Sequence, residues 1–306
     1  MKIIVTGGAG FIGSNLVDAL VERGDEVVVI DNLSTGRREN LNPHSKFYET
    51  SIGDPGLEDI FEKEKPDIVC HHAAQIDLRR SVNEPLFDAE VNILGSLNVI
   101  VNSIRSGVGK FVYASTGGAI YGEPQYLPVD EKHPINPVSQ YGVSKHTVEH
   151  YLHLYALQGE LNYVALRYPN VYGSRQNPFG EAGVIAIFAG QMLGGEQPTI
   201  FGPGDKTRDY THVSDIVEAN ILAIERGRNL ICNIGTGVET SDQDIFDAIA
   251  RALGYSSSPI YTSVRPGEIQ RICLDWSKAE KELGWSPKTT LKDGIAKTVS
   301  YFKKQN

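Results

Sequence analysis

The feature that most constrains the fold of this chain is a regular alternation of short apolar runs with longer amphipathic stretches. The runs are rich in Ile and Val and are typical of strands, while the stretches between them have helical periodicity. Strands that alternate with helices form βαβ units, and such units build a doubly wound parallel sheet with helices on both faces. The sequence therefore predicts an α/β fold, with strands at residues 3–5, 26–30, 67–70, 110–113 and 162–166.

The second half of the chain has a different pattern of turn and loop residues. From about Asn170, groups of Gly, Pro and charged residues separate shorter elements, which indicates a smaller C-terminal lobe of α/β type. Residues 214–226 have a further helical pattern and 230–234 a further strand pattern, so the first lobe is expected to recruit later segments. The 306 residues leave room for both lobes. We expect a first domain of residues 1–169, joined by about 208–236, and a second lobe of residues 170–207 and 237–306.

Charge, hydropathy and cysteine usage exclude several classes of protein. A formal net charge of -9 offers no basic surface for a phosphate backbone, so no nucleic-acid partner is expected. No run approaches the roughly 20 apolar residues of a membrane span, and the chain begins in a predicted strand rather than a signal peptide. Cys70, Cys232 and Cys273 are odd in number and widely spaced, which favours buried thiols over disulfides. We expect a soluble, cytoplasmic protein without membrane contact.

A glycine cluster directly follows the first predicted strand. Gly7, Gly10 and Gly13 have the spacing that allows a tight turn, close backbone approach to a pyrophosphate and close packing of the next helix. The N-terminus of that helix offers unpaired N–H groups and the positive end of the helix dipole. The cluster therefore predicts a dinucleotide site, with a Rossmann-type fold, whose contacts include Gly7, Gly10, Phe11, Ile12 and Gly13.

A carboxylate ends the second predicted strand. Asp31 lies about 20 residues beyond the glycines, where it can accept hydrogen bonds from ribose hydroxyls. The same charge repels a 2′-phosphate, so NAD is favoured over NADP as cofactor. Arg37 and Arg38 follow closely and keep NADP open. The alternative is purely structural, with the glycines serving a tight turn that Asp31 caps.

This spacing of glycines resembles the extended short-chain dehydrogenase/reductase family, and within it the nucleotide-sugar epimerases, along nearly the whole chain. The resemblance implies one segment at the adenosine ribose and another at the ribose and phosphate on the nicotinamide side. Where the family has an Asp-Ile pair beside adenine, this chain has Ser51 and Ile52, so no carboxylate contact to adenine is expected. The further cofactor contacts that the resemblance implies are Asn32, Ser34, Gly36, Ala73, Ala74, Gln75 and Asn92.

Tyr141 and Lys145 stand four residues apart near the start of a predicted helix, which places both side chains on one face. They match the family's Tyr-x-x-x-Lys pair, which implies that both contact the cofactor and that Tyr141 is the catalytic base. A free tyrosine has a pKa near 10, so a base that works near neutrality needs this pKa lowered by roughly three units. An adjacent ammonium and an oxidised nicotinamide are expected to supply that shift.

A catalytic hydroxyl is expected at the end of the core strand before this helix. Thr116 is the first candidate and Ser115 the second. Counted back from Tyr121, the family's hydroxyl position falls on Gly117, so the loop carries one extra residue and the assignment stays open by one position. Related dehydratases and decarboxylases have an acidic residue soon after this hydroxyl, and this chain has none there.

The second half of the chain resembles the family's nucleotide-sugar pocket. The resemblance implies that Tyr168 lies near the nicotinamide and Asn170 near the substrate diphosphate. Arg208 and Arg265 match segments that grip the diphosphate, and Glu268 matches a carboxylate at the uridine ribose. For either arginine alone, an exposed salt bridge is the alternative. The expected substrate contacts are Arg79, Thr116, Tyr141, Asn170, Val184, Ile200, Phe201, Arg208, Arg265 and Glu268.

Two histidine patterns could indicate a metal site. His146, His150 and His153 include an H-x-x-E-H pattern, but they lie well around the helix from the Tyr-Lys pair and lack a third ligand motif. A surface or a subunit interface is therefore favoured for them. Cys70 and the histidines after it close a buried strand pattern, in which neighbours point to opposite faces. No metal is expected.

The resemblance implies an NAD-dependent 4-epimerase of UDP-hexoses, an isomerase of galactose metabolism that interconverts UDP-glucose and UDP-galactose through a transient 4-keto sugar. Ile272, smaller than an aromatic residue at a position beside the sugar, favours tolerance of UDP-GlcNAc and UDP-GalNAc. UDP-glucuronate 4-epimerase stays open because of Arg79 and Arg80, as do a dehydratase and a decarboxylase. A non-catalytic NAD-binding sensor is the alternative from another class. By analogy, a homodimer is expected to form through residues 86–105 and 141–156.

Overall fold

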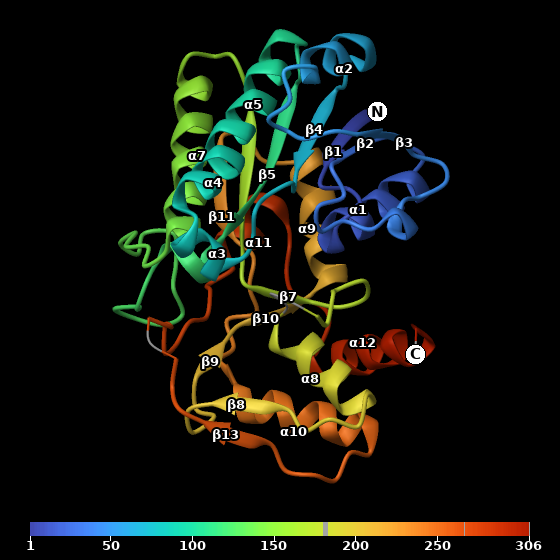
Figure 1. Ribbon diagram of the computed structural model, residues 1–306. Helices are drawn as coiled ribbons and strands as arrows, with labels where there is room; N and C mark the ends of the chain where they lie inside the picture. The colour runs from blue at the N-terminus through green and yellow to red at the C-terminus, as the bar shows by residue number, and fades with distance from the viewer. Residues whose placement is uncertain (180–182, 266, 306) are drawn as a thin grey trace.

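A seven-stranded sheet forms the centre of the computed structural model, which describes residues 1–179, 183–265 and 267–305. The strand order is β11-β6-β5-β4-β1-β2-β3, and every neighbouring pair is parallel. Figure 1 shows this sheet in the upper part of the molecule, with helices on either side. The predicted α/β class is confirmed. The strands are β1 (Lys2–Thr6), β2 (Glu26–Asp31), β3 (Lys46–Glu49), β4 (Ile68–His71), β5 (Lys110–Thr116), β6 (Tyr163–Tyr168) and β11 (Leu230–Asn233).

Each face of the sheet has its own apolar core, because side chains alternate along the strands. Ile3 and Val5 of β1 pack toward α1, α9 and α11, whereas Ile4 packs toward α2, α5 and α7 on the opposite face. The sheet is therefore doubly wound, as expected. The covering helices are α1 (Phe11–Glu22), α9 (Val213–Glu225), α11 (Ser277–Leu283), α2 (Leu57–Glu64), α5 (Ser96–Arg105) and α7 (Gln140–Leu157).

The strand order reverses at β1. From β1 the chain builds outward through β2 and β3 on one side, then returns to place β4, β5 and β6 on the other. In open parallel sheets, ligands bind beyond the carboxyl ends of the strands at such a switch point. This topology fixes where a binding cleft is to be sought.

The observed strands differ from the predicted ones mainly at their ends. β5 continues to Thr116 and β6 to Tyr168, so both carry their last residues to the edge of the sheet where the switch point lies. β3 was not predicted because it has only four residues and lies at the sheet edge, where its side chains are half-buried or exposed. The strand predicted at 230–234 is confirmed as β11, which pairs with β6.

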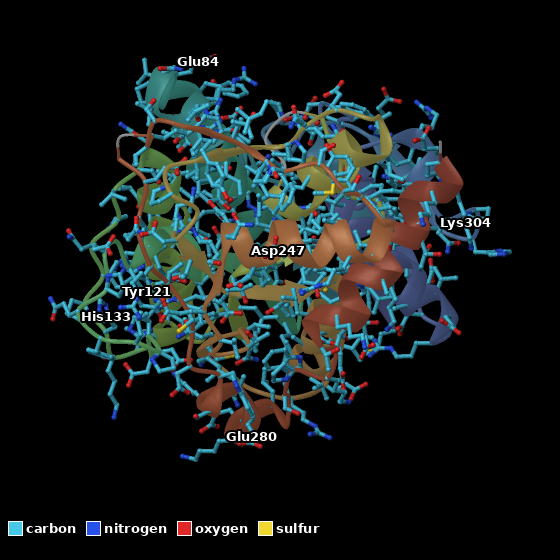
Figure 2. The ribbon with its side chains drawn as sticks, turned by 90° about the horizontal axis from the view of Figure 1, so that it is seen from below. Glu84, Tyr121, His133, Asp247, Glu280 and Lys304 are labelled. Carbon is cyan, nitrogen blue, oxygen red and sulfur yellow. The ribbon has the colours of Figure 1, made fainter. Side chains whose placement is uncertain are left out.

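A second group of short elements packs around a separate apolar core at the lower end of the molecule in Figure 1. Figure 2 views this end directly, with α10 and its labelled Asp247 crossing the front and Lys304 of α12 at one side. The residue boundaries of the two lobes stay a prediction, and residues 180–182, 266 and 306 within them lie outside the described part. The elements are α8 (Val184–Leu193), α10 (Asp242–Leu253), α12 (Leu291–Gln305), and the strand pairs β7 (Asn170–Tyr172) with β10 (Tyr210–His212), β8 (Thr199–Phe201) with β13 (Ile260–Thr262), and β9 (Thr207–Arg208) with β12 (Thr240–Ser241).

Short helices connect the strands around the sheet edge where the switch point lies. One of them, η2, is a π-helix of six residues, a form that is rare and frequently found at functional sites. Among the described residues, no helix has both the length and the apolar character needed to cross a membrane. The connecting helices are η1 (Arg38–Asn40), α3 (Leu78–Asn83), α4 (Pro85–Ala89), η2 (Glu90–Gly95) and α6 (Gly117–Ile120).

Candidate active site

A cleft lies at the carboxyl ends of β1, β2, β4, β5 and β6, at the switch point of the sheet. Most of the predicted cofactor contacts and three of the four catalytic candidates line it. Gly36, Gln75, Asn92 and Thr116 do not. The predicted residues in its wall are Gly7, Gly10, Phe11, Ile12, Gly13, Asp31, Asn32, Ser34, Ser51, Ile52, Ala73, Ala74, Ser115, Tyr141, Lys145 and Tyr168. Thr35 and His72, from the two segments that resemble the family's ribose contacts, also line it, as do Ile30, Thr50, Ile76, Val91 and Ala114, which were not predicted.

The glycines form a cradle that no larger residue could form. Gly7 has φ +69°, and a Cβ atom added there would lie 2.6 Å from the backbone nitrogen of Ala73. A Cβ atom at Gly13 would lie 2.2 Å from the carbonyl oxygen of Gly7. Gly10 caps α1 without a side chain, and no acidic residue occupies the first turn of that helix. The cradle and the open helix N-terminus fit the pyrophosphate of a dinucleotide.

Asp31 is held rigidly in the wall of the cleft. Its carboxylate, 7% exposed, accepts hydrogen bonds from the backbone N–H of Ala9 at 3.0 Å and of Leu33 at 2.8 Å. A Cβ atom at Gly36 would lie 2.8 Å from Oδ1 of Asp31, so Gly36 makes room for the carboxylate instead of lining the cleft. Asp31 therefore both caps the backbone N–H groups of the neighbouring loops and lines the cleft.

Gln75 and Asn92 support the loop after β4 from behind. Asn92, 1% exposed in η2, accepts from the backbone N–H of Gln75 at 2.8 Å and donates to its carbonyl oxygen at 2.9 Å. Both side chains also donate to Asp88, which is fully buried and accepts from Ser144 Oγ of α7 at 2.6 Å. Asp88 was not predicted from the sequence. Its spacing of four from Asn92 was the available signal, but only burial shows its importance.

Tyr141 and Lys145 lie together in the cleft. Ser139 caps α7 by accepting from the N–H of Gly142 at 3.2 Å, and the helix then presents both side chains on one face. Nζ of Lys145 lies 4.4 Å from the centre of the Tyr113 ring, and the lysine side chain is almost fully buried. The sequence prediction that this pair shares a face is confirmed by its position.

Burial dominates the electrostatics of Tyr141 and Lys145 within the protein. Burial raises the pKa of Tyr141, and the nearby Asp88 carboxylate raises it further. Burial lowers the pKa of Lys145 to about 7, although Glu149 and Asp88 oppose that shift. The expected lowering of the tyrosine pKa, which includes the charge of a bound oxidised nicotinamide, stays a prediction. It would have to come from positive charge near the phenol.

Ser115 and Thr116 point in different directions at the end of β5. Ser115 lines the cleft, and its Oγ donates to Oε1 of the buried Glu149 of α7 at 2.6 Å, so this hydroxyl already has a partner. Thr116 Oγ1 and Asn170 Oδ1 both lie beside Gly118, 4.0 and 3.8 Å from the position of a Cβ atom added there. A hydroxyl from the end of β5 and an amide from the start of β7 therefore both lie near Gly118.

The predicted substrate residues of the second lobe form a charged group away from the wall of this cleft. Cζ of Arg265 lies 3.4 Å from the centre of the Phe201 ring, and Nη1 lies 3.7 Å from Oε1 of Glu268. Glu268 also accepts from Lys206 at 2.7 Å, and Arg208 donates to the carbonyl oxygen of Thr207 at 2.7 Å. The structure therefore brings Phe201, Arg265 and Glu268 together. Pro266 lies outside the described residues.

The other predicted substrate residues lie in separate parts of the molecule. Ile200 is 1% exposed in the core of the second lobe, and Val184 begins α8. Arg79 is exposed on α3. Its neighbour Arg80 pairs with Glu84 at 3.1 Å, and Figure 2 shows Glu84 at the periphery of the molecule.

Comparison with known proteins identifies the family. The model of the NAD dependent epimerase/dehydratase family matches residues 3–235. The chain belongs to this family. It is similar to the UDP-glucose 4-epimerase of Thermotoga maritima, solved with UDP-glucose, at 49% identity and a TM-score of 0.98, covering 100% of this chain and 99% of that one. It is also similar to the Thermus thermophilus UDP-glucose 4-epimerase, solved with NAD, at 44% identity and a TM-score of 0.93 over 99% of each chain.

A third member of the family acts on a different sugar. The UDP-N-acetylglucosamine 4-epimerase of Methanobrevibacter ruminantium, solved with UDP-N-acetylmuramic acid, shares 34% identity with this chain. The TM-score is 0.95, and the match covers 100% of this chain and 99% of that one. The resemblance of the sequence to the extended short-chain dehydrogenases and their nucleotide-sugar epimerases is thus confirmed.

The histidines have structural partners in this epimerase-family fold. The ring nitrogens of His71 are hydrogen-bonded, Nδ1 with Thr6 Oγ1 at 2.6 Å and Nε2 with Ser96 Oγ at 2.9 Å. Burial holds the pKa of His71 well below the usual range. His146 Nδ1 lies 2.9 Å from Oε2 of Glu149, and its Nε2 lies 3.0 Å from Nε2 of His150. In the described part of the chain, no three His, Cys, Asp or Glu side chains are grouped so that they could hold a metal ion.

His72, which the strand pattern placed at the end of a buried strand, also contributes to the cleft. It lines the cofactor cleft, and its Nε2 lies 3.3 Å from the hydroxyl of Tyr168. Its buried Nδ1 has no hydrogen-bond partner in the described structure, and burial lowers its pKa to about 4. A neutral imidazole with an unsatisfied ring nitrogen in the cleft fits a bound polar group, which supports the assignment of this cleft to a dinucleotide.

Proposed function

We propose that this protein is an NAD-dependent 4-epimerase of UDP-hexoses that interconverts UDP-glucose and UDP-galactose. The observation that carries the proposal is the position of Tyr141 and Lys145 in the same cleft as the glycine cradle. The similarity to UDP-glucose 4-epimerases over the full length of the chain supports it.

In this mechanism, NAD supplies reversible hydride acceptance at C4 of the sugar. Tyr141 would take the proton of the 4-hydroxyl as C4 is oxidised to a ketone, and it would return that proton to the oxygen as the ketone, rotated to present its opposite face, is reduced again. Lys145 stabilises the phenolate as an ammonium, which offsets the burial that raises the pKa of Tyr141. Thr116 donates a hydrogen bond at the reacting oxygen, next to Asn170. The buried surroundings of the pair exclude water from the 4-keto sugar.

The binding roles of the remaining residues follow the same proposal. Residues 1–169, with about 208–236, bind NAD, and residues 170–207 and 237–306 bind the nucleotide sugar. In this division Arg208 and Arg265 hold the diphosphate, Glu268 the uridine ribose, and Phe201 the uracil. The Arg265 side chain, now over the Phe201 ring, is long enough to turn toward the diphosphate.

The dehydratase, decarboxylase and UDP-glucuronate alternatives are not favoured. Gly117, Gly118 and Ala119 in α6 carry no acid beside Thr116 that could move a second proton. Arg80, one of two arginines offered for a uronate, is engaged with Glu84 and lies over the ring of Phe87 at 3.9 Å. The supported chemistry is reversible oxidation at C4.

The substrate is tested by incubating the purified protein separately with UDP-Glc, UDP-GlcNAc and UDP-GlcA and identifying the products by NMR. We expect UDP-galactose from UDP-Glc. The 4-epimer of UDP-GlcNAc tests the tolerance proposed from Ile272, which is buried beside Tyr121 and Leu274. Absence of that product would overturn the tolerance. No turnover of any nucleotide sugar would instead favour a non-catalytic NAD-binding sensor.

The strand-end hydroxyl is tested by a pair of variants. Thr116→Val is expected to lower kcat by about 100-fold, because a hydrogen bond at the developing oxyanion is lost. Ser115→Ala is expected to cause a much smaller loss, because its hydroxyl bonds Glu149. Steady-state kinetics with UDP-galactose measure both effects. The opposite order of the two losses would assign the catalytic hydroxyl to Ser115.

We further propose a homodimer and a cytoplasmic location. Large apolar side chains are exposed on α4, η2 and α7, among them Leu86, Leu94, Leu154 and Leu157 at 86%, 61%, 53% and 70%. Such an apolar surface favours association with a second copy through these elements. The three cysteines are buried and unpaired, which fits a reducing compartment.

A further inference from the structure

A buried pair of opposite charges lies directly behind the catalytic pair. Glu149 follows Lys145 by one turn of α7 and is 1% exposed, and Arg167 of β6 is 4% exposed. Nε and Nη2 of Arg167 donate to Oε1 and Oε2 of Glu149 at 2.9 and 2.7 Å. This two-pronged contact fixes the carboxylate in one orientation. The mechanism above gives neither residue a role.

The carboxylate of Glu149 also connects the cofactor cleft to the surface of α7. Oε1 accepts from the hydroxyl of Ser115, which lines the cleft, and Oε2 lies 2.9 Å from Nδ1 of His146. Burial alone would raise the pKa of Glu149, but the hydrogen bonds from Arg167, His146 and Ser115 hold it at about 2. Glu149 is therefore a carboxylate at every pH at which an enzyme of this kind would work.

Lys145 is buried on the same face of α7 as Glu149, one turn away. Burial penalises the ammonium strongly, and the groups that oppose this penalty are Glu149 and Asp88. Asp88 already accepts hydrogen bonds from three neighbouring side chains. The titratable groups that face Lys145 are Tyr141 and Glu149 of α7, Asp88 of α4, Tyr113 of β5, and His71 and His72 at the end of β4.

We propose that Glu149 is a positioning residue for the reaction: anchored by Arg167, its carboxylate is the counter-charge that keeps Lys145 a cation beside Tyr141. By accepting from Ser115, it also leaves Thr116 as the strand-end hydroxyl that faces the sugar. Arg167 cancels part of the field of Glu149 at Lys145. Loss of Glu149 and loss of Arg167 must therefore move the charge state of Lys145 in opposite directions. The role in catalysis rests on the proposed function, but the charge state of Lys145 does not.

The test is a pair of single variants in the NAD-bound, full-length protein. The pKa of Lys145 is read from the NMR shift of its ¹³Cε atom as the pH is changed, with Lys145→Arg to assign the signal. Glu149→Gln is expected to lower the midpoint by roughly one unit, since a charge one helical turn away is lost. The ammonium then disappears earlier as the pH rises, so the basic limb of kcat/KM moves to lower pH. Arg167→Met is expected to shift both midpoint and limb upward, because Glu149 keeps its contacts with Ser115 and His146 and stays a carboxylate.

Glu64→Gln serves as the matched control. Glu64 is a buried carboxylate on α2 that is hydrogen-bonded to Lys46 and Tyr48, so its loss removes a buried charge without touching the cleft. In the Glu64→Gln variant, the midpoint of the Lys145 titration is expected to equal that of the wild type. If Glu149→Gln does not fold, the double variant Glu149→Met/Arg167→Met removes both buried charges together and must also lower the midpoint.

A merely structural role would lower stability and kcat in both single variants without moving the midpoint. Unchanged midpoints, or shifts of the same sign in the two variants, would overturn the proposal. A wild-type protein that turns over no nucleotide sugar would contradict the proposed function alone. In that case the NMR titration still decides whether Glu149 sets the charge of Lys145.

Discussion

A Tyr141→Phe variant is expected to lose about a thousandfold in kcat while it still binds NAD. The phenol is the acid and base of the proposed reaction, and a positioned proton-transfer group contributes about 10²–10⁴-fold to a rate, or about 4 kcal/mol for a factor of a thousand. The ring stays in the cleft wall, so cofactor affinity should change little. Turnover of UDP-galactose and NAD binding by calorimetry measure the two effects separately.

Tyr151→Phe provides the control for this experiment. Tyr151 is a half-buried tyrosine on the same helix that does not line the cleft, so removal of its hydroxyl changes the same atom outside the site. Its kcat is expected to stay within a factor of about two of wild type. If Tyr141→Phe turned over UDP-hexoses as fast as the wild type, the proton would have to move through another group and the mechanism would be wrong.

The second large effect is expected for Gly13→Ala, which should weaken NAD binding by more than tenfold and destabilise the fold by about 3 kcal/mol. The added Cβ atom would lie 2.2 Å from the carbonyl oxygen of Gly7, and this neighbour is backbone that cannot rotate away. α1 would have to move back from the cradle, which displaces its N-terminus from the pyrophosphate. Urea unfolding and NAD titration measure the change.

Gly109→Ala is the matched control for that substitution. A Cβ atom at Gly109 would lie 3.5 Å from the carbonyl oxygen of Asp67, an ordinary contact, and Gly109 lies outside the cleft. Its NAD affinity is expected to equal that of the wild type. Wild-type affinity in Gly13→Ala as well would show that close packing of α1 on the cradle is not required for the cofactor.

The sequence predicted the elements that depend on local pattern. Apolar periodicity identified six of the seven sheet strands, all except β3, because buried parallel strands are continuous runs of Ile and Val. β3 has no such run, since it lies at the edge with a polar residue at each end. The strand predicted at 110–113 was shorter than β5, because the last residues of β5, Ser115 and Thr116, are polar.

Residues missed by the sequence share a different property. Asp88 and Glu149 are ordinary acids on helices by their sequence context, and acids on helices are usually solvated. Only packing shows that the first is fully buried and the second 1% exposed. Burial makes their charges strong at short range. The spacing of four residues, between Asp88 and Asn92 and between Lys145 and Glu149, was a signal in the sequence, but it does not show burial.

The sequence by itself determined the glycine cradle, the position of Asp31 and the common face of Tyr141 and Lys145, because each depends on backbone geometry within a few residues. The tertiary structure alone decided that Ser115 bonds Glu149, that Arg167 of a neighbouring strand anchors this carboxylate, and that burial shifts the pKa of both members of the catalytic pair. These features depend on contacts between segments far apart in the chain and on exclusion of water. Neither can be derived from local residue patterns.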